Sequence, residues 1–195
     1  MNEAVLLAWE QEIRADPTRI RVRFPAAARE VGRSTAETPL GEVRVEDRVR
    51  GRLLLALAEG LADDPDRLSA EVHDLYRFGD ADERRAVLLT LHRLPIEGLG
   101  SDLLHDALRT NDLRLVAAAL GPYGEAVLDD AAWRQGVLKC LFTGVPVALV
   151  SGLADRTDDE LLRMVTSYAE ERVAAGRPVP EDARRILATR PSQEP

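Results

Sequence analysis

The only lysine of the chain, Lys139, lies in the segment Asp129–Gly144, which also contains the only cysteine and one of two tryptophans. The other 25 of the 26 basic residues are arginines, so a need for positive charge alone does not explain this lysine. A lysine amine can serve as a base or nucleophile when burial lowers its pKa, or it can pair with an anionic ligand. The apolar neighbours Leu138 and Cys140 equally suit a lysine whose stem packs while its ammonium reaches solvent.

Four further residues could contact a ligand or a partner. Arg109 and Asn111 flank a predicted helix break, where they could bind a carboxylate or phosphate, or Asn111 could simply cap the next helix. Trp133 has helical spacing with Val137, which is typical of core packing. Arg156 precedes a helix start and could form an ion pair or reach a neighbouring hairpin. The candidate ligand- or partner-binding residues are therefore Arg109, Asn111, Trp133, Lys139 and Arg156.

The sequence contains no motif of a metal, cofactor or hydrolase site. Its three histidines lack the spacing of metal ligands, and Cys140 has the apolar neighbours of an inert thiol. A glycine-rich phosphate loop, a dinucleotide-binding fingerprint and a GxSxG turn are also missing. We predict no metal, no cofactor and no catalytic residue. An enzyme that uses Lys139 as an amine catalyst remains an alternative.

The composition is that of an acidic globular protein. With 34 acidic and 26 basic residues, the net charge is −8, which disfavours binding to the phosphates of nucleic acids. No apolar run approaches the ~18 residues that a membrane span needs, and the first residues lack the basic start of a secretory signal. A single cysteine is consistent with a reducing compartment. We expect a cytoplasmic protein, with at most peripheral membrane association through a partner.

Hydrophobic periodicity predicts helices along most of the chain. Aromatic residues make up only 4% of it, which favours helix over strand. Residues 19–24 alternate charged and apolar types as a strand would, but no segment offers a clear sheet partner, so helix is favoured and strand stays open. Residues 32–42 are typical of a surface loop. The predicted helices cover residues 2–14, 46–61, 65–76, 80–94, 101–120 with a break at 110–111, 129–144, 157–176 and 181–189.

The succession of helices and short loops predicts an all-α fold. We expect an irregular stack of antiparallel helical hairpins, either HEAT-like or a bundle. The length of 195 residues suits one domain, over residues 1–189, followed by a polar tail, residues 190–195. Two capping-box patterns, Asp80 with Glu83 and Thr157 with Glu160, mark helix starts.

The second half of the chain resembles a known family. The pattern begins with RTN at 109–111, AW at 132–133, VLK at 137–139, LF at 141–142 and G-x-P at 144–146. It continues with GL-x-DR at 152–156, EL at 160–161, RM at 163–164, YA at 168–169, ER at 171–172 and AAGR at 174–177. In order and spacing these residues are similar to the EboA family, from about residue 84 to residue 177.

The resemblance implies a role in metabolite traffic. Proteins of this family belong to ebo gene clusters, which are described as helping a small-molecule product or precursor cross the cytoplasmic membrane. The implied partners are other proteins of such a cluster (a UbiA-like prenyltransferase, a TatD-like hydrolase and a sugar-isomerase-like protein), a metabolite, or both. We expect a cytosolic accessory protein that binds the metabolite or a partner. The alternative is a pure scaffold that docks the membrane prenyltransferase through an acidic surface.

Overall fold

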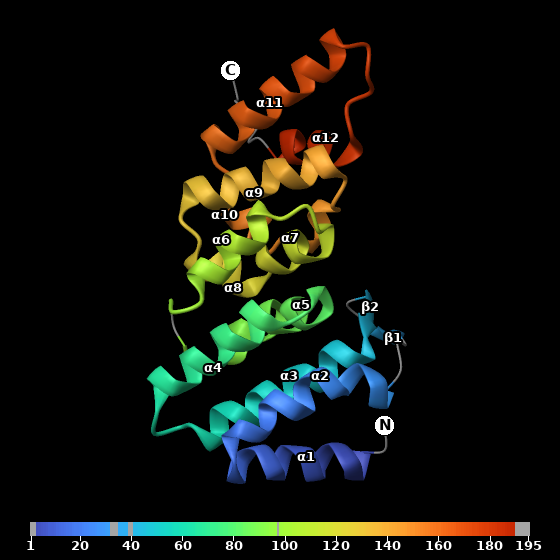
Figure 1. The fold of residues 1–195 in the computed structure, drawn as a ribbon. Coiled ribbons are helices and arrows are strands. Elements are labelled where there is room, and N and C mark those ends of the chain that lie inside the picture. The colour runs from blue at the N-terminus through green and yellow to red at the C-terminus, as the bar shows by residue number, and fades with distance from the viewer. Residues whose placement is uncertain (1–2, 32–34, 39–40, 97, 190–195) are drawn as a thin grey trace. The chain divides into compact units, whose positions relative to one another are not determined.

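The computed structural model describes residues 3–31, 35–38, 41–96 and 98–189, and these residues are mostly helical (Figure 1). The predicted all-α fold is confirmed. By its internal contacts the chain divides into two compact units, Met1–Asp106 and Ala107–Pro195. A single helical domain over residues 1–189 stays a prediction, and the predicted polar tail, residues 190–195, lies outside the described residues.

The first unit is organised around helix α3, Val45–Gly60. This helix packs against α1, Glu3–Ala15, against α2, Ile20–Val31, and against α5, Ala81–Thr90, as the lower part of Figure 1 shows. Helix α4, Pro65–Phe78, packs against α5. Because α3 has neighbours on several sides, its leucines at successive turns are fully buried, namely Leu53, Leu54 and Leu57.

The segment 19–24 is helical, which settles the alternative between helix and strand. Asp16 caps a short 3-10 turn, Pro17–Arg19 (η1), and α2 begins directly after it at Ile20. The alternation of charged and apolar residues is misleading because Ile20, Phe24 and Ala27, at helical spacing, are all fully buried. Pro25 lies inside α2 without ending it.

A small β-hairpin interrupts the helices and corrects the predicted loop. Strands β1, Thr35–Thr38, and β2, Gly41–Arg44, pair antiparallel, with Thr35 opposite Arg44. The predicted loop also covers residues 32–34 and 39–40, which lie outside the described residues. The β-branched threonines of β1 suit a strand. Their neighbours lack an alternating hydrophobic pattern, so periodicity does not predict a strand here.

Charged side chains lie inside the first unit where α3 meets α5. The guanidinium of Arg85 donates two hydrogen bonds of 2.9 Å to the carboxylate of Asp47, and both side chains are buried. Burial raises the pKa of Asp47, and the hydrogen bonds from Arg85 oppose that rise. Arg50, only 1% exposed, donates to the carbonyl oxygen of Phe24 at 3.3 Å. The pairing of Asp47 with Arg85 lets α3 and α5 pack closely although both helices carry buried charges at this contact.

The second unit contains the end of α6 and all later helices. Helix α9 packs against α7 and α11, and α11 packs against α12. Trp133, Val137 and Cys140, one helical turn apart on α9, are fully buried, which confirms the core prediction for Trp133. The elements are α6, Ser101–Arg109; α7, Leu113–Ala119; α8, Pro122–Val127; α9, Asp130–Thr143; α10, Leu153–Arg156; α11, Asp159–Ala174; and α12, Glu181–Ala188, with a 3-10 turn at Val147–Leu149 (η3). A further 3-10 turn, Leu91–Arg93 (η2), follows α5 in the first unit.

Several helix ends differ by one residue from their sequence-based positions. The capping box of Asp80 and Glu83 is confirmed at the start of α5. At the start of α11, however, the cap is Asp158, whose carboxylate accepts from the amide of Leu161 at 2.9 Å, and not Thr157. The predicted end at Gly121–Pro122 is also the beginning of α8, because proline suits the first position of a helix. Most predicted helix boundaries lie within two residues of the observed ones; the helix predicted to end at residue 94 ends at Thr90 and continues as a 3-10 turn to Arg93.

Candidate functional site

Lys139 closes the carboxyl end of helix α6. Its ammonium donates hydrogen bonds to the carbonyl oxygens of Leu108 and Thr110, at 2.6 and 2.7 Å. The last carbonyl groups of a helix have no donor within the helix, and the helix dipole makes that end negative, so a cation there is stabilising. A compact ammonium with three rotatable donors can satisfy two converging carbonyls at once. This geometry gives the single lysine a structural role within the second unit.

Gly136 faces Leu108 and Leu120 where α9 approaches α6 and the end of α7. A Cβ atom at this position would lie 2.7 Å from one methyl carbon of Leu120 and 3.3 Å from a methyl carbon of Leu108. Gly136 lies three residues before Lys139, about one turn along the helix. The glycine therefore lets α9 come near enough for the lysine to reach the end of α6.

Arg156 performs a similar task at the end of α8. Its guanidinium donates to the carbonyl oxygens of Glu125 and Leu128, both at 2.8 Å, and to the carboxylate of Asp130 at 2.8 Å. The same guanidinium lies 4.9 Å from the centre of the Trp133 ring. Trp133 is completely buried, with 0% of its surface accessible. Among the described residues, its Nε1 has no hydrogen-bond acceptor.

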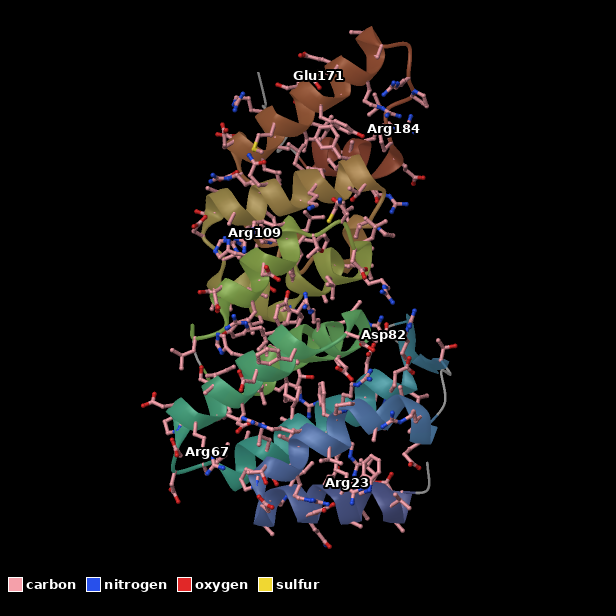
Figure 2. All side chains as sticks on the ribbon, viewed as in Figure 1. Arg23, Arg67, Asp82, Arg109, Glu171 and Arg184 are labelled. Atoms are coloured by element: carbon pink, nitrogen blue, oxygen red, sulfur yellow. The ribbon has the colours of Figure 1, made fainter. Side chains whose placement is uncertain are left out.

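Arg109 and Asn111 lie at the surface next to the break between α6 and α7. Both are exposed, and Arg109 is labelled in Figure 2. Asn111 is not the cap of the next helix, because the carboxylate of Asp112 accepts from the amide of Arg114 at 2.9 Å and fills that role. The guanidinium of Arg114 holds the pKa of Asp112 below its usual value, which keeps this cap charged.

The five sequence-based candidates include two neighbouring groups: Arg156 lies over the ring of Trp133, and Lys139 binds the carbonyls on either side of Arg109. The polar atoms of Lys139 and Arg156 bind backbone carbonyls at the ends of two different helices, and Trp133 belongs to the core. Neither of the two surface pockets described below is lined by any of the five. Their role in ligand binding stays a prediction, while the contacts of Lys139 and Arg156 account for both as helix caps.

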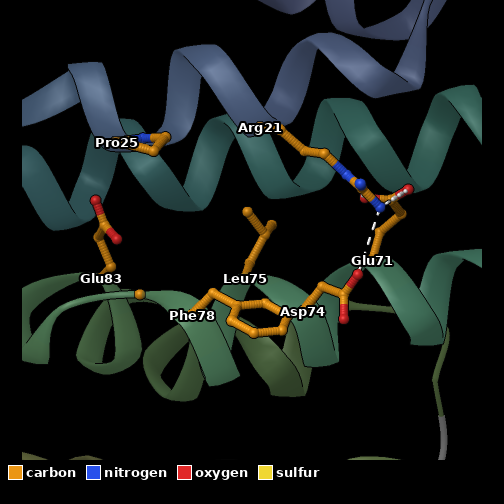
Figure 3. A pocket seen from close by; sticks show the side chains of 8 residues that line it. Arg21, Pro25, Glu71, Asp74, Leu75, Phe78 and Glu83 are labelled. Atoms are coloured by element: carbon orange, nitrogen blue, oxygen red, sulfur yellow. Dashed lines mark hydrogen bonds and ion pairs between the residues drawn. The ribbon is translucent and has the colours of Figure 1, made fainter.

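A pocket of about 240 Å³ opens between α2, α4 and α5 in the first unit (Figure 3). Its middle is apolar, with Leu75 and Phe78 on α4 and Pro25 across from them on α2. Phe78 is 77% exposed, which is unusual for so large an apolar side chain at the end of a helix. The lining residues are Arg21, Pro25, Glu71, Asp74, Leu75, Phe78, Gly79 and Glu83.

Charged groups stand at both ends of this pocket. At one end Arg21 donates to the carboxylate of Glu71 at 2.9 and 3.0 Å, and to Asp74 at 3.4 Å. The carboxylate of Glu71 raises the pKa of the Arg21 guanidinium. At the other end, the carboxylate of Glu83 accepts from the amide of Asp80 at 3.1 Å and lies 3.6 Å from the guanidinium of Arg50. The pocket therefore combines an apolar centre with charged ends.

The tight turn between α4 and α5 shapes one wall of this pocket. Gly79 follows the last residue of α4, and a Cβ atom there would lie 2.5 Å from the carbonyl oxygen of Leu75 and 2.9 Å from the Cβ of Glu83. Any larger residue would push α4 and α5 apart at this point. Gly79 thus fixes the distance between Leu75 and Glu83 across the pocket.

A second, shallower pocket of about 220 Å³ lies between α9 and α11 in the second unit. The rings of Phe142 and Tyr168 meet edge to face there, with centres 4.6 Å apart, and Phe142 is 60% exposed. Val173, near the end of α11, is 66% exposed, and the buried residues of this helix lie between Leu161 and Tyr168. The lining residues are Leu138, Phe142, Arg163, Met164, Ser167, Tyr168 and Glu171.

The residues of the first pocket were not among the sequence-based candidates. They come from three helices and are up to 62 residues apart in sequence, from Arg21 to Glu83, so no local motif marks them. One signal was available: Phe78 precedes a glycine at a helix end, outside the apolar stripe that Leu68, Val72 and Leu75 form. An aromatic residue outside such a stripe can indicate an exposed site.

No group of three or more His, Cys, Asp or Glu side chains in the described part of the chain could hold a metal ion. None of the helices within these residues is both long enough and apolar enough to cross a membrane.

Comparison with known proteins gives one match. Residues 29–188 match the family described as metabolite traffic protein EboA. The chain belongs to the EboA family. No curated protein and no solved structure matches the chain.

The EboA match is wider than the resemblance in the second half of the sequence. It covers α3 to α12, and with them the walls that α4 and α5 contribute to the first pocket, while Arg21 and Pro25 precede it. It also covers the whole α9–α11 pocket. Apart from Ser167, every residue that lines this second pocket belongs to the EboA-like pattern of the sequence.

Proposed function

We propose that this EboA-family protein acts in metabolite traffic by binding a small molecule, without transforming it, in the α2–α4–α5 pocket. The protein would hold the metabolite in the cytoplasm and deliver it to another component of its cluster. The observation that carries the proposal is the pocket itself, with an apolar middle of Pro25, Leu75 and Phe78 and charged groups at both ends. Apolar walls with a few placed polar groups are typical of small-molecule sites.

The size of the pocket supports a small ligand, or one end of a larger one. Its volume of about 240 Å³ lies just below the roughly 300–1,000 Å³ of sites that enclose drug-sized molecules. The contacts of Lys139 support a non-catalytic role. Lys139 is the residue that would act as the amine catalyst if the protein were an enzyme. Two of its three donor positions bind carbonyl oxygens, so its amine is engaged in the fold.

Binding can be tested with a panel of small aromatic and aliphatic compounds, detected by ligand-observed NMR. We expect several compounds to bind the native protein and to lose binding in Leu75→Trp, because the indole fills the pocket. The matched control is Leu138→Trp, which fills the α9–α11 pocket. Binding that survives Leu75→Trp but is lost in Leu138→Trp would move the site to the second unit. The absence of binding by every compound would reject the proposal.

A second candidate function is that of a scaffold for the partner proteins of the cluster, among them the UbiA-like prenyltransferase, the TatD-like hydrolase and the sugar-isomerase-like protein. The observation that favours it is the exposed Phe142 on the α9–α11 surface. Membranes that contain the prenyltransferase should retain the native protein and release the Phe142→Ser variant. Equal retention of the two proteins would exclude this surface. Release by rising salt would indicate that the acidic surface makes the contact.

A further inference from the structure

We infer that the α2–α4–α5 pocket takes an uncharged, mainly apolar ligand, and that the ion pairs along its rim exclude charged ones. This inference rests on the proposed function and names the chemical class of its ligand. The charged residues of the lining are Arg21, Glu71, Asp74 and Glu83. Each of them is already engaged with another group of the chain, so a charged ligand would meet side chains whose charges are in use.

One end of the pocket is closed by an ion pair between α2 and α4. Arg21 donates to Glu71 at 2.9 and 3.0 Å, with one hydrogen bond to each carboxylate oxygen (Figure 3). A bidentate pair of this kind is among the strong hydrogen-bonded contacts in proteins. The side chain of Glu71 is only 8% exposed, so its charge depends on Arg21. Asp74 lies 3.4 Å from the same guanidinium and is 48% exposed, so water screens its charge.

Arginines outside the lining balance the negative groups at the other end. Arg50, which is 1% exposed, lies 3.6 Å from the carboxylate of Glu83. Arg84 donates to the carbonyl oxygens of Gly79 and Arg77, at 3.0 and 3.2 Å, where α4 ends. Basic side chains that bind the last carbonyls of a helix offset the negative end of its dipole. This end of the pocket is therefore also balanced by cations of the fold.

The surface left for a ligand is the apolar middle of the pocket. Leu75 points from α4 towards α2, where Pro25 presents a ring without an amide hydrogen (Figure 3). Phe78 is 77% exposed, and the guanidinium of Arg77 lies 5.6 Å from the centre of its ring. An apolar ligand would cover this ring and remove apolar surface from water. A ligand charge would lose its hydration here and gain a partner only by breaking an ion pair of the chain.

The pair of Arg21 and Glu71 thus determines which ligand charge the pocket accepts. Without Arg21, the carboxylates of Glu71 and Asp74 lose their partner and would attract a cation. Without the charge of Glu71, the guanidinium of Arg21 keeps only its longer contact with Asp74 and would attract an anion. Single substitutions at the two positions should therefore change the preference in opposite directions.

The inference can be tested with three compounds that share one apolar body: 2-phenylethanol, 2-phenylethylamine and 3-phenylpropionate. At pH 7 the alcohol is uncharged, the amine is a cation and the acid is an anion. Their affinities for the full chain would be measured by NMR titration. We expect the alcohol to bind at least about tenfold more tightly than either ion. Its affinity should be the same at low and high salt, and its binding should be lost in Leu75→Trp.

Two variants and one matched control test the role of the ion pair. Arg21→Gln should raise the affinity of the amine relative to the alcohol, and Glu71→Gln should raise that of the acid, each by at least about tenfold. Arg67→Gln removes a charge from the first turn of α4, outside the lining, and should leave the order of affinities unchanged. Glu71→Gln keeps a side-chain acceptor for Arg21, so it carries the test if Arg21→Gln does not fold.

The outcomes separate the ligand class from the existence of the site. If the amine or the acid binds the native protein as tightly as the alcohol, and Leu75→Trp abolishes that binding, the uncharged class is wrong and the proposed pocket stands. If neither variant of the ion pair changes the order of affinities, the inference is overturned. The same holds if the alcohol binds Leu75→Trp as well as the native protein. If none of the three compounds and no member of the broader panel binds, both the inference and the proposed function fail.

Discussion

The carboxylate of Asp158 lies 3.0 Å from Nε of Arg134 and links the first turn of α11 to α9. The same carboxylate accepts from the amide of Leu161 and caps α11. We expect Asp158→Ala to lower the free energy of unfolding by about 1 kcal/mol, the usual effect of losing a helix cap. Thr157→Ala is the matched control and should have a smaller effect, since Thr157 only donates to the carbonyl of Leu153. Urea unfolding of the two variants would distinguish them, and equal losses would contradict the cap assignment.

Because the pKa of Asp158 is lowered in the folded protein, the free energy of unfolding should depend on pH in the acid range. The hydrogen bond from Arg134, followed by that from Leu161, holds the pKa of Asp158 below its usual value of 3.8. A lowered pKa in the folded state stabilises the protein above pH 3.8, and this contribution is lost as the pH falls through the lowered value. Denaturant unfolding across this range should show a weaker pH dependence in Asp158→Asn than in the native protein. An unchanged dependence would show that other groups dominate.

Lys139→Met should destabilise the second unit. The change removes two charge-assisted hydrogen bonds and leaves the carbonyls of Leu108 and Thr110 without their donor. We expect a loss of about 2 kcal/mol in the free energy of unfolding, measured by urea titration. Lys139→Arg keeps the charge and should lose less. If Lys139→Met were instead as stable as the native protein but inactive in metabolite traffic, the lysine would be a ligand-binding residue after all.

The thiol of Cys140 should be inert in the folded protein. Burial raises its pKa from 9.0 to about 11, and the thiolate is the reactive form. Thiol-reactive reagents should therefore modify the native chain slowly at pH 8 and modify the urea-unfolded chain fast. Because the pKa is raised in the folded state, its stabilising contribution is complete below pH 9 and decreases as the pH rises towards 11. Fast modification of the native protein would contradict the burial of this side chain.

The Asp47–Arg85 pair offers a double-variant test within the first unit. Arg85→Met leaves the carboxylate of Asp47 buried without its partner and should cost about 3–5 kcal/mol of stability. The double variant Asp47→Leu with Arg85→Met removes both charges and should recover most of this loss. Thermal or urea unfolding of the single and double variants measures the coupling. Additive losses would mean that the two side chains do not interact.

Local signals in the sequence predicted the helices well. The capping box of Asp80 and Glu83 spans four residues, and Gly144 ends α9 in a left-handed conformation that glycine adopts easily. These features depend on neighbours along the chain. Where two cap residues stand side by side, as Thr157 and Asp158 do, spacing alone could not choose between them. The hairpin was missed because a short strand without alternating hydrophobicity resembles a loop.

The surroundings of the candidate residues could not be predicted, because they depend on contacts that are distant in sequence. Composition singled out Lys139, but its acceptors lie 29 and 31 residues earlier in the chain. The α2–α4–α5 pocket likewise forms only when Arg21 and Glu71, 50 residues apart, meet as an ion pair. Helical periodicity identifies which face of a helix is buried, but not which helix covers it.

Apart from α-amino groups, a chain with one lysine presents acylating reagents with a single primary amine. In the folded second unit two carbonyl oxygens hold that amine, so it must leave them before it can react. The rate at which Lys139 is acylated therefore measures how often its side chain releases the end of α6 while the rest of the protein stays folded. Mass spectrometry could follow this local opening at a known position without introducing any label by mutation.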